Sequence, residues 1–358
     1  MNPNRKAHSR NPEPVVANWD KPALITQTSF LNNSLGAFAF NPVIGCGFGC
    51  QFCCASESAN SQAALKLADC GVKDSEATWG KYQFLKIWDE ERFVKSIESA
   101  EDRIGMIEKA GAESAVVYST LTDPYQVIAA PDTPRRGQFS NQLRRMVRRS
   151  LELVLENSFL DVRVLTRSPM ASRDFDLFKA FGPRLTFGMS VPTLRDDLVK
   201  AYEPHAPSVS ERLQTLKAAQ RKGLNVFVAI SPIYPECDEI DLRTTMQTVA
   251  TLNPVSIFCE AINFREGIGA RIVKGGAATN LKNIGIFSSP FTWHNYAITC
   301  LATVQRIAQE LGILDRIHLM PARQLGDANL IERTGDPAAC RAWLDYWRNR
   351  QSNWPQRS

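Results

Sequence analysis

Four of the nine cysteines in this chain lie within nine residues, in the stretch Asn41-Pro-Val-Ile-Gly-Cys46-Gly-Phe-Gly-Cys50-Gln-Phe52-Cys53-Cys54. The other five cysteines are scattered singly along the sequence. An odd number of cysteines with one tight group argues against a disulfide framework and indicates a metal site in a reducing compartment. The spacing C-x3-C-x2-C supplies three thiolates from one short, glycine-rich loop.

The number of ligands restricts which metal this loop can hold. A structural zinc site normally closes with four ligands from two pairs, and the sequence has no second pair. The four histidines are dispersed, and none lies at metal-ligand spacing from another. Three soft thiolates instead fit a [4Fe–4S] cluster whose fourth iron takes an external ligand. A zinc loop with Cys54 as fourth ligand is the alternative, although the neighbouring side chains of Cys53 and Cys54 point in different directions.

Short apolar runs alternate with amphipathic stretches along most of the 358 residues. The runs are rich in β-branched and aromatic side chains, which is typical of strands buried on both faces of a parallel sheet. Six strands are expected, at 37–44, 114–118, 162–165, 185–189, 226–230 and 255–258. Right-handed strand–helix–strand crossovers then lead to a doubly wound sheet or a barrel.

Helix boundaries are visible between these runs. Asp89 can cap a helix whose Phe93, Ile97, Ile104 and Ile107 share one face. Ser208 and Glu211 match the S-x-x-E capping box, and Gly223 follows as a stop signal.

We expect one domain of strand–helix units, with a flexible polar arm at residues 1–20, a core domain at 21–330, and a C-terminal helix and tail at 331–358. The last helix is expected near 337–350. Hydrophobic residues make up 44% and charged residues 22% of the chain, which excludes extensive disorder. No apolar run reaches the ~18–20 residues that a membrane span needs, and the polar start lacks a signal peptide's apolar core. These features predict a soluble, cytoplasmic protein without a membrane partner.

Four further motifs follow the cysteine motif, namely Leu121-Thr-Asp-Pro-Tyr-Gln126, Leu165-Thr-Arg-Ser-Pro169 with Arg173-Asp174, Glu203-Pro-His-Ala-Pro-Ser208 and Ser231-Pro-Ile-Tyr-Pro235. In this order, the set resembles the spore photoproduct lyase-like branch of the radical S-adenosylmethionine (SAM) superfamily over about residues 25–265. The resemblance implies an α/β fold, a partial (β/α)6 TIM-like barrel with the cofactors at its open top.

The same resemblance implies the chemistry. Cys46, Cys50 and Cys53 would ligate a [4Fe–4S] cluster whose open iron binds SAM. An electron from a donor such as flavodoxin or ferredoxin would cleave SAM to a 5′-deoxyadenosyl radical, which would abstract hydrogen from a substrate.

The resemblance also implies contacts between SAM and residues at the strand ends, namely Phe52, Ser119, Thr120, Thr122, Arg167, Ser190 and Ile230. The segment 119–122 is expected near the methionine amino group, and Arg167 is expected to grip the methionine carboxylate. Ser190 is expected near a ribose hydroxyl and Ile230 against adenine. The alternatives are ordinary ones: a turn capped by Asp123, a surface arginine, and core positions.

The chain departs from the lyases at two places. In the lyases, a cysteine that returns hydrogen to the substrate precedes the Thr/Ser-Asp pair, and here Thr120 occupies that place. Tyrosines flank the third cluster cysteine in the lyases, where this chain has Phe52 and Cys54. The path of hydrogen return is therefore missing or rebuilt, with Cys54 as the candidate catalytic donor.

A run of arginines gives one independent indication of a nucleic-acid substrate. On a helix, Arg144, Arg145, Arg148 and Arg149 would share one face and could follow a phosphate backbone of DNA or RNA. The alternative is a solvated outer helix, and the net charge of +5 permits anionic partners without requiring them. Aromatic residues near the C-terminus could stack on bases or anchor the last helix: Trp343, Tyr346, Trp347 and Trp354.

Three hypotheses follow. The chain is a radical SAM enzyme acting on nucleic acid, a radical SAM enzyme acting on a peptide or small metabolite, or a non-catalytic iron–sulfur or zinc protein.

Overall fold

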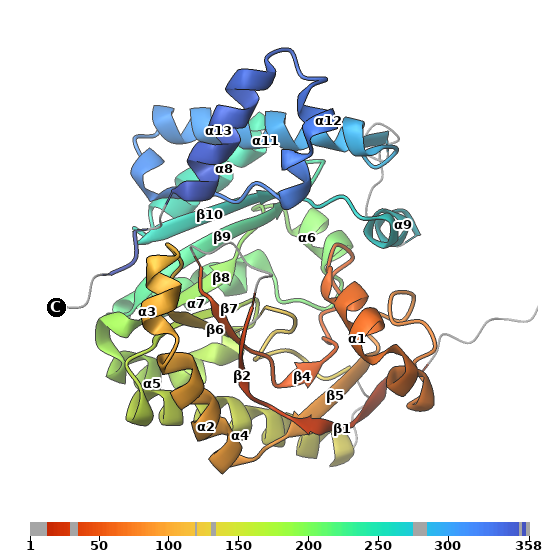
Figure 1. Cartoon of the computed structure of the whole chain (residues 1–358), viewed down its shortest axis with the longest axis vertical. Helices are drawn as coiled ribbons and strands as arrows, with labels where there is room; N and C mark the ends of the chain where they lie inside the picture. The colour runs from red at the N-terminus through yellow and green to blue at the C-terminus, as the bar shows by residue number, and fades with distance from the viewer. Residues whose placement is uncertain are drawn as a thin grey trace, which may run out of the picture.

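The computed structural model of the chain describes residues 13–28, 35–118, 120–129, 134–274, 285–350 and 353–355. Its main feature is an eight-stranded sheet in the order β11-β10-β9-β8-β7-β6-β3-β2 (Figure 1). All neighbouring pairs in this sheet are parallel except β2–β3. The strands are β2 (Ile25–Gln27), β3 (Phe38–Phe40), β6 (Ala115–Tyr118), β7 (Asp161–Thr166), β8 (Leu185–Ser190), β9 (Asn225–Ile233), β10 (Ser256–Ala261) and β11 (Ile317–Leu319).

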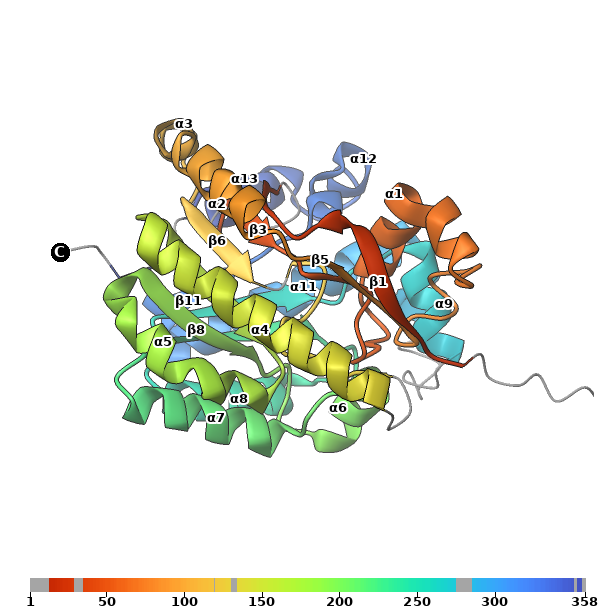
Figure 2. The same ribbon diagram turned by 90° about the horizontal axis from the view of Figure 1, so that it is seen from below.

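Helices cover the outer face of this sheet, and α4, α5, α7 and α8 run along one side of it in Figure 2. The helices are α1 (Ala55–Asp69), α2 (Glu90–Glu101), α3 (Ile104–Lys109), α4 (Pro134–Asn157), α5 (Phe175–Ala180), α6 (Asp196–Tyr202), α7 (Val209–Arg221), α8 (Glu239–Ala250), α9 (Glu266–Lys274), α11 (Pro290–Glu310), α12 (Ala328–Ile331) and α13 (Pro337–Asn349). A parallel sheet with helices outside is the predicted α/β fold, a partial TIM-like barrel, which is thus confirmed.

The predicted caps form as expected. The Asp89 carboxylate accepts a hydrogen bond from the Arg92 N–H, and Ser208 and Glu211 make the reciprocal capping box. The helix predicted to run from Asp89 through Ile107 is instead two helices, α2 and α3, separated at residues 102–103. No helix in the described ranges is both long and apolar enough to span a membrane.

A second, three-stranded sheet was not predicted. It consists of β1 (Val15–Pro22), β5 (Tyr82–Ile87) and β4 (Val43–Ile44), with β5 in the middle. The expectation of a flexible arm up to residue 20 is therefore wrong from Val15 onward, because Val16 and Trp19 are buried in this part of the molecule. Residues 1–12 of the predicted arm lie outside the described ranges.

The strand predicted at 37–44 is divided between the two sheets. Its first part is β3 in the large sheet and its second part is β4 in the small one. Pro42 lies between them and has no N–H to donate to a sheet ladder, which favours a break there. The chain thus crosses from barrel to small sheet just before the cysteines.

Alternation of side chains gives the barrel strands two different faces. Val226 and Val228 of β9 belong to the main core under the outer helices. Phe227 and Ala229 point the other way and join Phe258 and Trp354 in a separate cluster on the inner face of the barrel. This cluster fills the barrel interior away from the cysteine loop.

Candidate functional site

The cysteine loop follows β4 and is packed too tightly for larger residues at its glycines. Gly45 has φ +86°, and a Cβ there would lie 2.1 Å from the Tyr82 carbonyl oxygen. A Cβ on Gly47 would lie 2.1 Å from the Val127 carbonyl oxygen. Both positions therefore require glycine, for the backbone conformation or for the close approach of another chain segment.

Hydrogen bonds fix the first half of the loop to the segment after β6. The Thr122 hydroxyl donates to the Gly45 carbonyl at 2.8 Å, and the Gly47 N–H donates to Gln126 Oε1 at 2.8 Å. Gln126 Nε2 donates in turn to the Thr122 hydroxyl at 2.6 Å. Thr122 thus holds the loop in place, and its expected contact with SAM stays a prediction.

Arg271 of α9 fixes the second half of the loop. Its guanidinium donates to the carbonyl oxygens of Gln51 at 3.1 Å and Cys53 at 2.5 Å, and to the Ser56 hydroxyl at 2.6 Å. Only 11% of the Arg271 side chain is exposed, so these hydrogen bonds are shielded from water. The loop is therefore held between the end of β6 and α9.

The three predicted ligands lie in one apolar environment. Cys46 and Cys50 are buried beside Phe48 and Trp79, and Cys53 packs against the same cluster. Burial raises the pKa of the Cys46 thiol to about 12, and it raises the pKa of Cys50 and Cys53 as well. Arg167 acts in the opposite direction on the pKa of Cys50 and Cys53, because a nearby cation favours the thiolate.

The residues around the loop fit a sulfur-rich cluster. The Trp79 indole N–H is buried and has no hydrogen-bond partner in the described part of the chain, although it belongs to the same cluster as Cys46 and Cys50. Sulfides and thiolates of an iron–sulfur cluster accept such hydrogen bonds.

Zinc fits less well. Within the described ranges, no three His, Cys, Asp and Glu side chains converge as the ligands of one ion do. The ligands of a cluster bind different iron atoms and need not converge in that way. Burial raises the pKa of the Cys54 thiol, and the charges that act on it are those of Cys53, Arg265 and Glu260.

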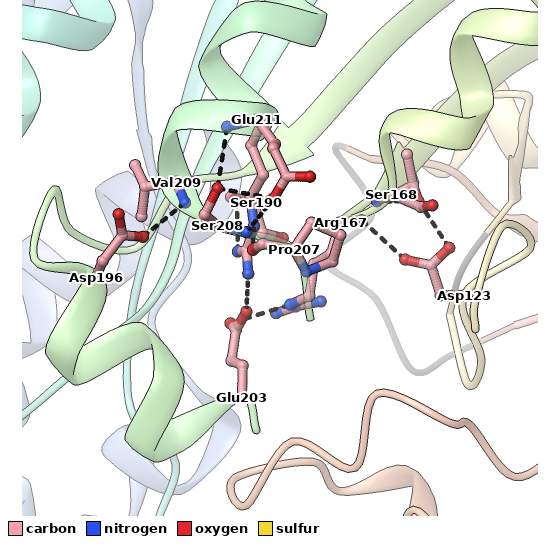
Figure 3. A network of polar contacts seen from close by, with 12 residues as sticks. Asp123, Arg167, Ser168, Ser190, Asp196, Glu203, Pro207, Ser208, Val209 and Glu211 are labelled. Atoms are coloured by element: carbon pink, nitrogen blue, oxygen red, sulfur yellow. Dashed lines mark hydrogen bonds and ion pairs between the residues drawn. The ribbon is translucent and has the colours of Figure 1, made fainter. Parts of the chain in front are cut away.

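Arg167, which follows β7, is part of a buried ionic network (Figure 3). Its Nε donates to Glu203 Oε1 at 3.0 Å, and Glu203 also pairs with Arg212. The Tyr234 hydroxyl donates to the same Glu203 oxygen at 3.0 Å. Burial works against ionisation of Glu203, but the two guanidinium groups outweigh it and hold the pKa of this carboxyl below its usual value.

The network aims Arg167 toward the cysteine loop. Its guanidinium carbon lies 5.5 Å from the centre of the Phe52 ring, and Phe52 packs against Tyr234. Glu203 binds the guanidinium through Nε, and within the described residues the two terminal nitrogens have no hydrogen-bond partner. The Arg167 side chain is 17% exposed, and a guanidinium with both terminal nitrogens free of protein partners can bind a carboxylate in a bidentate way.

Asp123 connects the ends of β6 and β7. Its carboxylate accepts hydrogen bonds from the Thr166 hydroxyl at 2.7 Å and from the backbone N–H groups of Arg167 at 2.8 Å and Tyr125 at 2.9 Å. The hydrogen bond from the Tyr125 N–H forms the turn capped by Asp123, which the sequence offered as the alternative to a SAM contact for residues 119–122. Asp123 therefore positions the backbone of Arg167, a role that the sequence did not reveal.

The remaining predicted residues differ in their placement. Ser119 lies outside the described residues. Thr120 is hydrogen-bonded to the Asn41 side-chain amide at 2.7 Å, just before the cysteine loop. Ser190 is buried at the end of β8, and its carbonyl accepts from Arg212 at 3.0 Å.

The expected contact of Ile230 with adenine stays a prediction. Its side chain belongs to the outer core with Val228, and its neighbour Ala229 is the residue that belongs to the inner cluster. Strand alternation places Ser231 on the inner face as well. The Ser231 hydroxyl donates to Glu260 of β10 at 2.9 Å, and Asn263 donates to the other oxygen of that carboxylate at 2.8 Å. Burial raises the pKa of the Glu260 carboxyl.

Several residues of the site were missed or only quoted within motifs: Glu203, Arg212, Tyr234, Gln126, Arg271 and Glu260. The first two were detectable in principle, since a Glu in the Glu203–Ser208 motif and an Arg inside an apolar helix face both suggest a buried ion pair. Arg271 had no such signal, because its partners are more than two hundred residues away in sequence.

The arginine face of α4 is only partly available to phosphates. Arg148 pairs with Asp174 at 2.9 Å and Glu152 at 3.1 Å. Arg149 pairs with Glu90 at 2.7 Å. Arg144 and Arg145 are exposed. Two of the four predicted nucleic-acid contacts are thus already neutralised, as expected for the alternative of a solvated outer helix.

The C-terminal aromatic residues mostly serve packing. The indole N–H groups of Trp343 and Trp347 both donate to Gln305 Oε1, at 2.7 and 3.1 Å. Trp354 is stacked on Phe258 with ring centres 5.5 Å apart. These three residues anchor the C-terminal segment, whereas Tyr346 is 54% exposed.

Comparisons with known proteins agree with this geometry. The family model described as the radical SAM superfamily matches residues 40–249. The uncharacterized protein ORF301 of Acidianus two-tailed virus is 26% identical over 233 residues, which cover 64% of this chain and 68% of that protein. The uncharacterized protein MJ0683 of Methanocaldococcus jannaschii is 24% identical over 204 residues, which cover 57% of this chain and 63% of that protein.

A solved structure of spore photoproduct lyase complexed with dinucleoside spore photoproduct has a similar fold, with a TM-score of 0.58. The match covers 86% of this chain and 82% of the lyase chain, at 12% sequence identity. At this level of identity the similarity concerns the fold alone.

Proposed function

Because this chain belongs to the radical SAM superfamily, we propose that Cys46, Cys50 and Cys53 hold a [4Fe–4S] cluster and that SAM binds between this cluster and Arg167. The observation that carries the proposal is the placement of three cysteines, two of them buried, on one tightly held loop beside a guanidinium whose terminal nitrogens have no partner among the described residues. When bound, the two cofactors supply one-electron cleavage of the C5′–S bond of SAM and thereby hydrogen abstraction from a substrate.

The protein residues have three tasks in this proposal. The three thiols would ligate iron as thiolates, and because burial raises their pKa, cluster binding would release protons and weaken as the pH falls. Arg167 binds the methionine carboxylate while Glu203 keeps its guanidinium oriented. Phe52 and Tyr234 cover the site and keep water away from it.

The substrate has two candidate classes. The lyase with a similar fold acts on a nucleic-acid photoproduct, which supports a nucleic-acid substrate for this chain. The ion pairs of Arg148 and Arg149 and the absence of a cysteine at Thr120 favour a peptide or small metabolite instead. The charges of Glu260, in β10, and Arg265 act on the Cys54 thiol, so this candidate hydrogen donor lies close to polar groups beside the cysteine loop.

The decisive experiment is anaerobic incubation of the reconstituted, dithionite-reduced protein with SAM. We expect formation of 5′-deoxyadenosine, and no formation by a Cys50→Ala variant. A protein that binds iron and sulfide stoichiometrically but releases no 5′-deoxyadenosine would support the non-catalytic iron–sulfur hypothesis. A salt-dependent mobility shift on DNA or RNA would separate the two substrate classes.

A further inference from the structure

Helix α4 passes β5 and β1 outside the barrel (Figures 1 and 2). Residues of these three elements line a groove. Its volume is about 490 Å³, and its apolar lining includes Leu85, Trp88 and Met146. Ile87, also in the lining, is 49% exposed although it is a large aliphatic residue at the end of β5. An exposed apolar strip of this kind, bordered by charged residues, is typical of an interaction surface.

The charged residues that line this groove are all cations, namely Lys86, Arg145 and Arg149. Lys86 is half-buried and lies beside Lys21, and neither forms an ion pair within the described residues. Burial, together with the charge of Lys21, lowers the pKa of Lys86. Arg145 adds a third cation that has no acidic partner in the described ranges. Arg149 at the groove edge is different, because it already pairs with Glu90.

Some exposed arginines of this protein are paired with carboxylates, as in Arg195–Asp197, Arg243–Glu310 and Arg306–Glu239. The cations at the groove differ in that they lie close to one another and beside an apolar strip. Placing Lys86 and Lys21 together has an electrostatic cost that an anionic partner would remove. The groove therefore fits a partner with a negatively charged, partly apolar surface.

The groove lies directly behind the strand that leads into the cysteine loop. Leu85 pairs with Val43 of β4, and the Lys86 backbone N–H donates to the Pro42 carbonyl at 3.0 Å. Cys46 follows Val43 by three residues, at most about 11 Å of extended chain. At its other end, β5 reaches the loop itself, where Tyr82 packs against Gly45.

We propose that this groove, formed by Leu85–Trp88, Arg145 and Met146 with Lys21 beside it, is the docking surface for an acidic protein that delivers electrons to the cysteine loop. The inference rests on the proposed function, which requires one electron from outside for each SAM cleaved. The carrier loses one electron and the cluster gains it, so no other reactant is needed. The cations would steer the carrier and the apolar strip would hold it, close to the strand that enters the loop.

The test compares two reductants on the same reconstituted protein. A Lys86→Glu/Arg145→Glu variant is mixed anaerobically with reduced flavodoxin, used as an acidic carrier, or with dithionite, and cluster reduction is followed by loss of visible absorbance. We expect reduction by flavodoxin to slow by about tenfold or more at low ionic strength, and the difference to shrink at high salt. Reduction by dithionite should be unchanged.

Lys217→Glu on α7 is the matched control, because it reverses an exposed cation in a different surface depression. It should leave both rates unchanged. Equal flavodoxin rates for wild type and the double variant would overturn the docking surface. Unchanged reduction together with weakened binding of single-stranded DNA would also overturn it, and would assign the groove to nucleic acid. Failure of the proposed function is distinguishable, since wild type would then yield no 5′-deoxyadenosine even with dithionite.

Discussion

Individual side chains of this site act in environments that the fold has made unusual. Buried thiols hold their protons more strongly than exposed ones, so metal binding at Cys46, Cys50 and Cys53 must displace protons that burial retains. Arg167 and Glu203 stabilise each other in a region from which water is largely excluded. Replacing one of these cysteines, Arg167 or Glu203 should therefore change cofactor binding or stability more than replacing an exposed residue of the same type.

Replacing Cys50 with alanine should abolish cluster binding, because the loop has no other thiol at the required spacing. Cys70→Ala should bind iron normally, since Cys70 lies beyond the loop at the end of α1. Iron and sulfide analysis of the reconstituted proteins measures both. A Cys50→Ala protein with full iron content would contradict the ligand assignment.

Replacing Arg167 with alanine should weaken SAM binding by roughly ten- to a hundredfold, since loss of a charge-assisted hydrogen bond costs about 1.5–3 kcal/mol. The visible spectrum of the cluster should be unchanged. Equilibrium binding of SAM to the reconstituted protein measures the effect, and an exposed arginine such as Arg195 serves as control. An affinity equal to that of wild type would show that another residue holds the carboxylate.

Thr120 leads to a prediction about reaction outcome. A threonine O–H bond is far stronger than a thiol S–H bond, so Thr120 should not return hydrogen to a substrate. We therefore expect inefficient repair when the protein is given a dinucleoside spore photoproduct, SAM and reductant anaerobically. Multiple-turnover release of two thymines would contradict this. If a Cys54→Ala substitution then stopped that release, Cys54 would be the hydrogen donor.

Among the elements, the cysteine loop depends most on neighbours that are distant in sequence. Gln126 connects the cysteine loop to the segments around it. Its side-chain carbonyl accepts hydrogen bonds from the Gly47 N–H and the Gln83 amide, and its own amide donates to Thr122. All these atoms are buried, so the loss of one hydrogen bond leaves a polar group that water cannot reach and that has no other partner.

A Gln126→Ala variant should thus be less stable by at least about 1–3 kcal/mol, the usual cost of one buried unsatisfied group. It should also retain less iron, because Gly47 lies between the first two ligands. Urea unfolding and iron analysis measure the two effects. Gln214→Ala on the exposed surface of α7 should change neither, and a stable, fully loaded Gln126→Ala protein would show that the loop holds itself.

For the whole molecule, the C-terminal segment contributes to the interior of the barrel. Trp354 is 5% exposed and packs on Phe227 and Phe258, and the Arg163 guanidinium lies 4.2 Å from the centre of its ring. Gly188 makes room for this packing, because a Cβ there would lie 2.4 Å from the Phe227 ring. The tail thus fills space that the strands leave open.

Trp354→Ala should destabilise the protein by about 3–5 kcal/mol, as expected for truncating a buried tryptophan. Tyr346→Ala, at an exposed position of α13, should change stability by no more than about 0.5 kcal/mol. Denaturant unfolding measures both variants. An unfolding midpoint of Trp354→Ala equal to that of wild type would show that the tail is not part of the cooperative fold.

The sequence by itself revealed the cysteine motif from which the ligands are predicted, the order of strands and helices in the barrel, and the caps of α2 and α7. These features depend on spacing and periodicity within short segments, where backbone geometry relates residue type to structure directly. Arg167 could be placed at a strand end for the same reason.

Only the tertiary structure decided which residues meet at the site. Neighbouring side chains of a strand point to opposite faces, so a shift of one residue changes the face on which a side chain lies. Ile230 packs in the main core, whereas its neighbour Ala229 faces the barrel interior. The small sheet, the Glu203 pair of Arg167, the Arg271 contacts and the place of Trp354 all join segments far apart in the chain. Such contacts are selected by mutual burial and charge compensation in three dimensions, which no local pattern specifies.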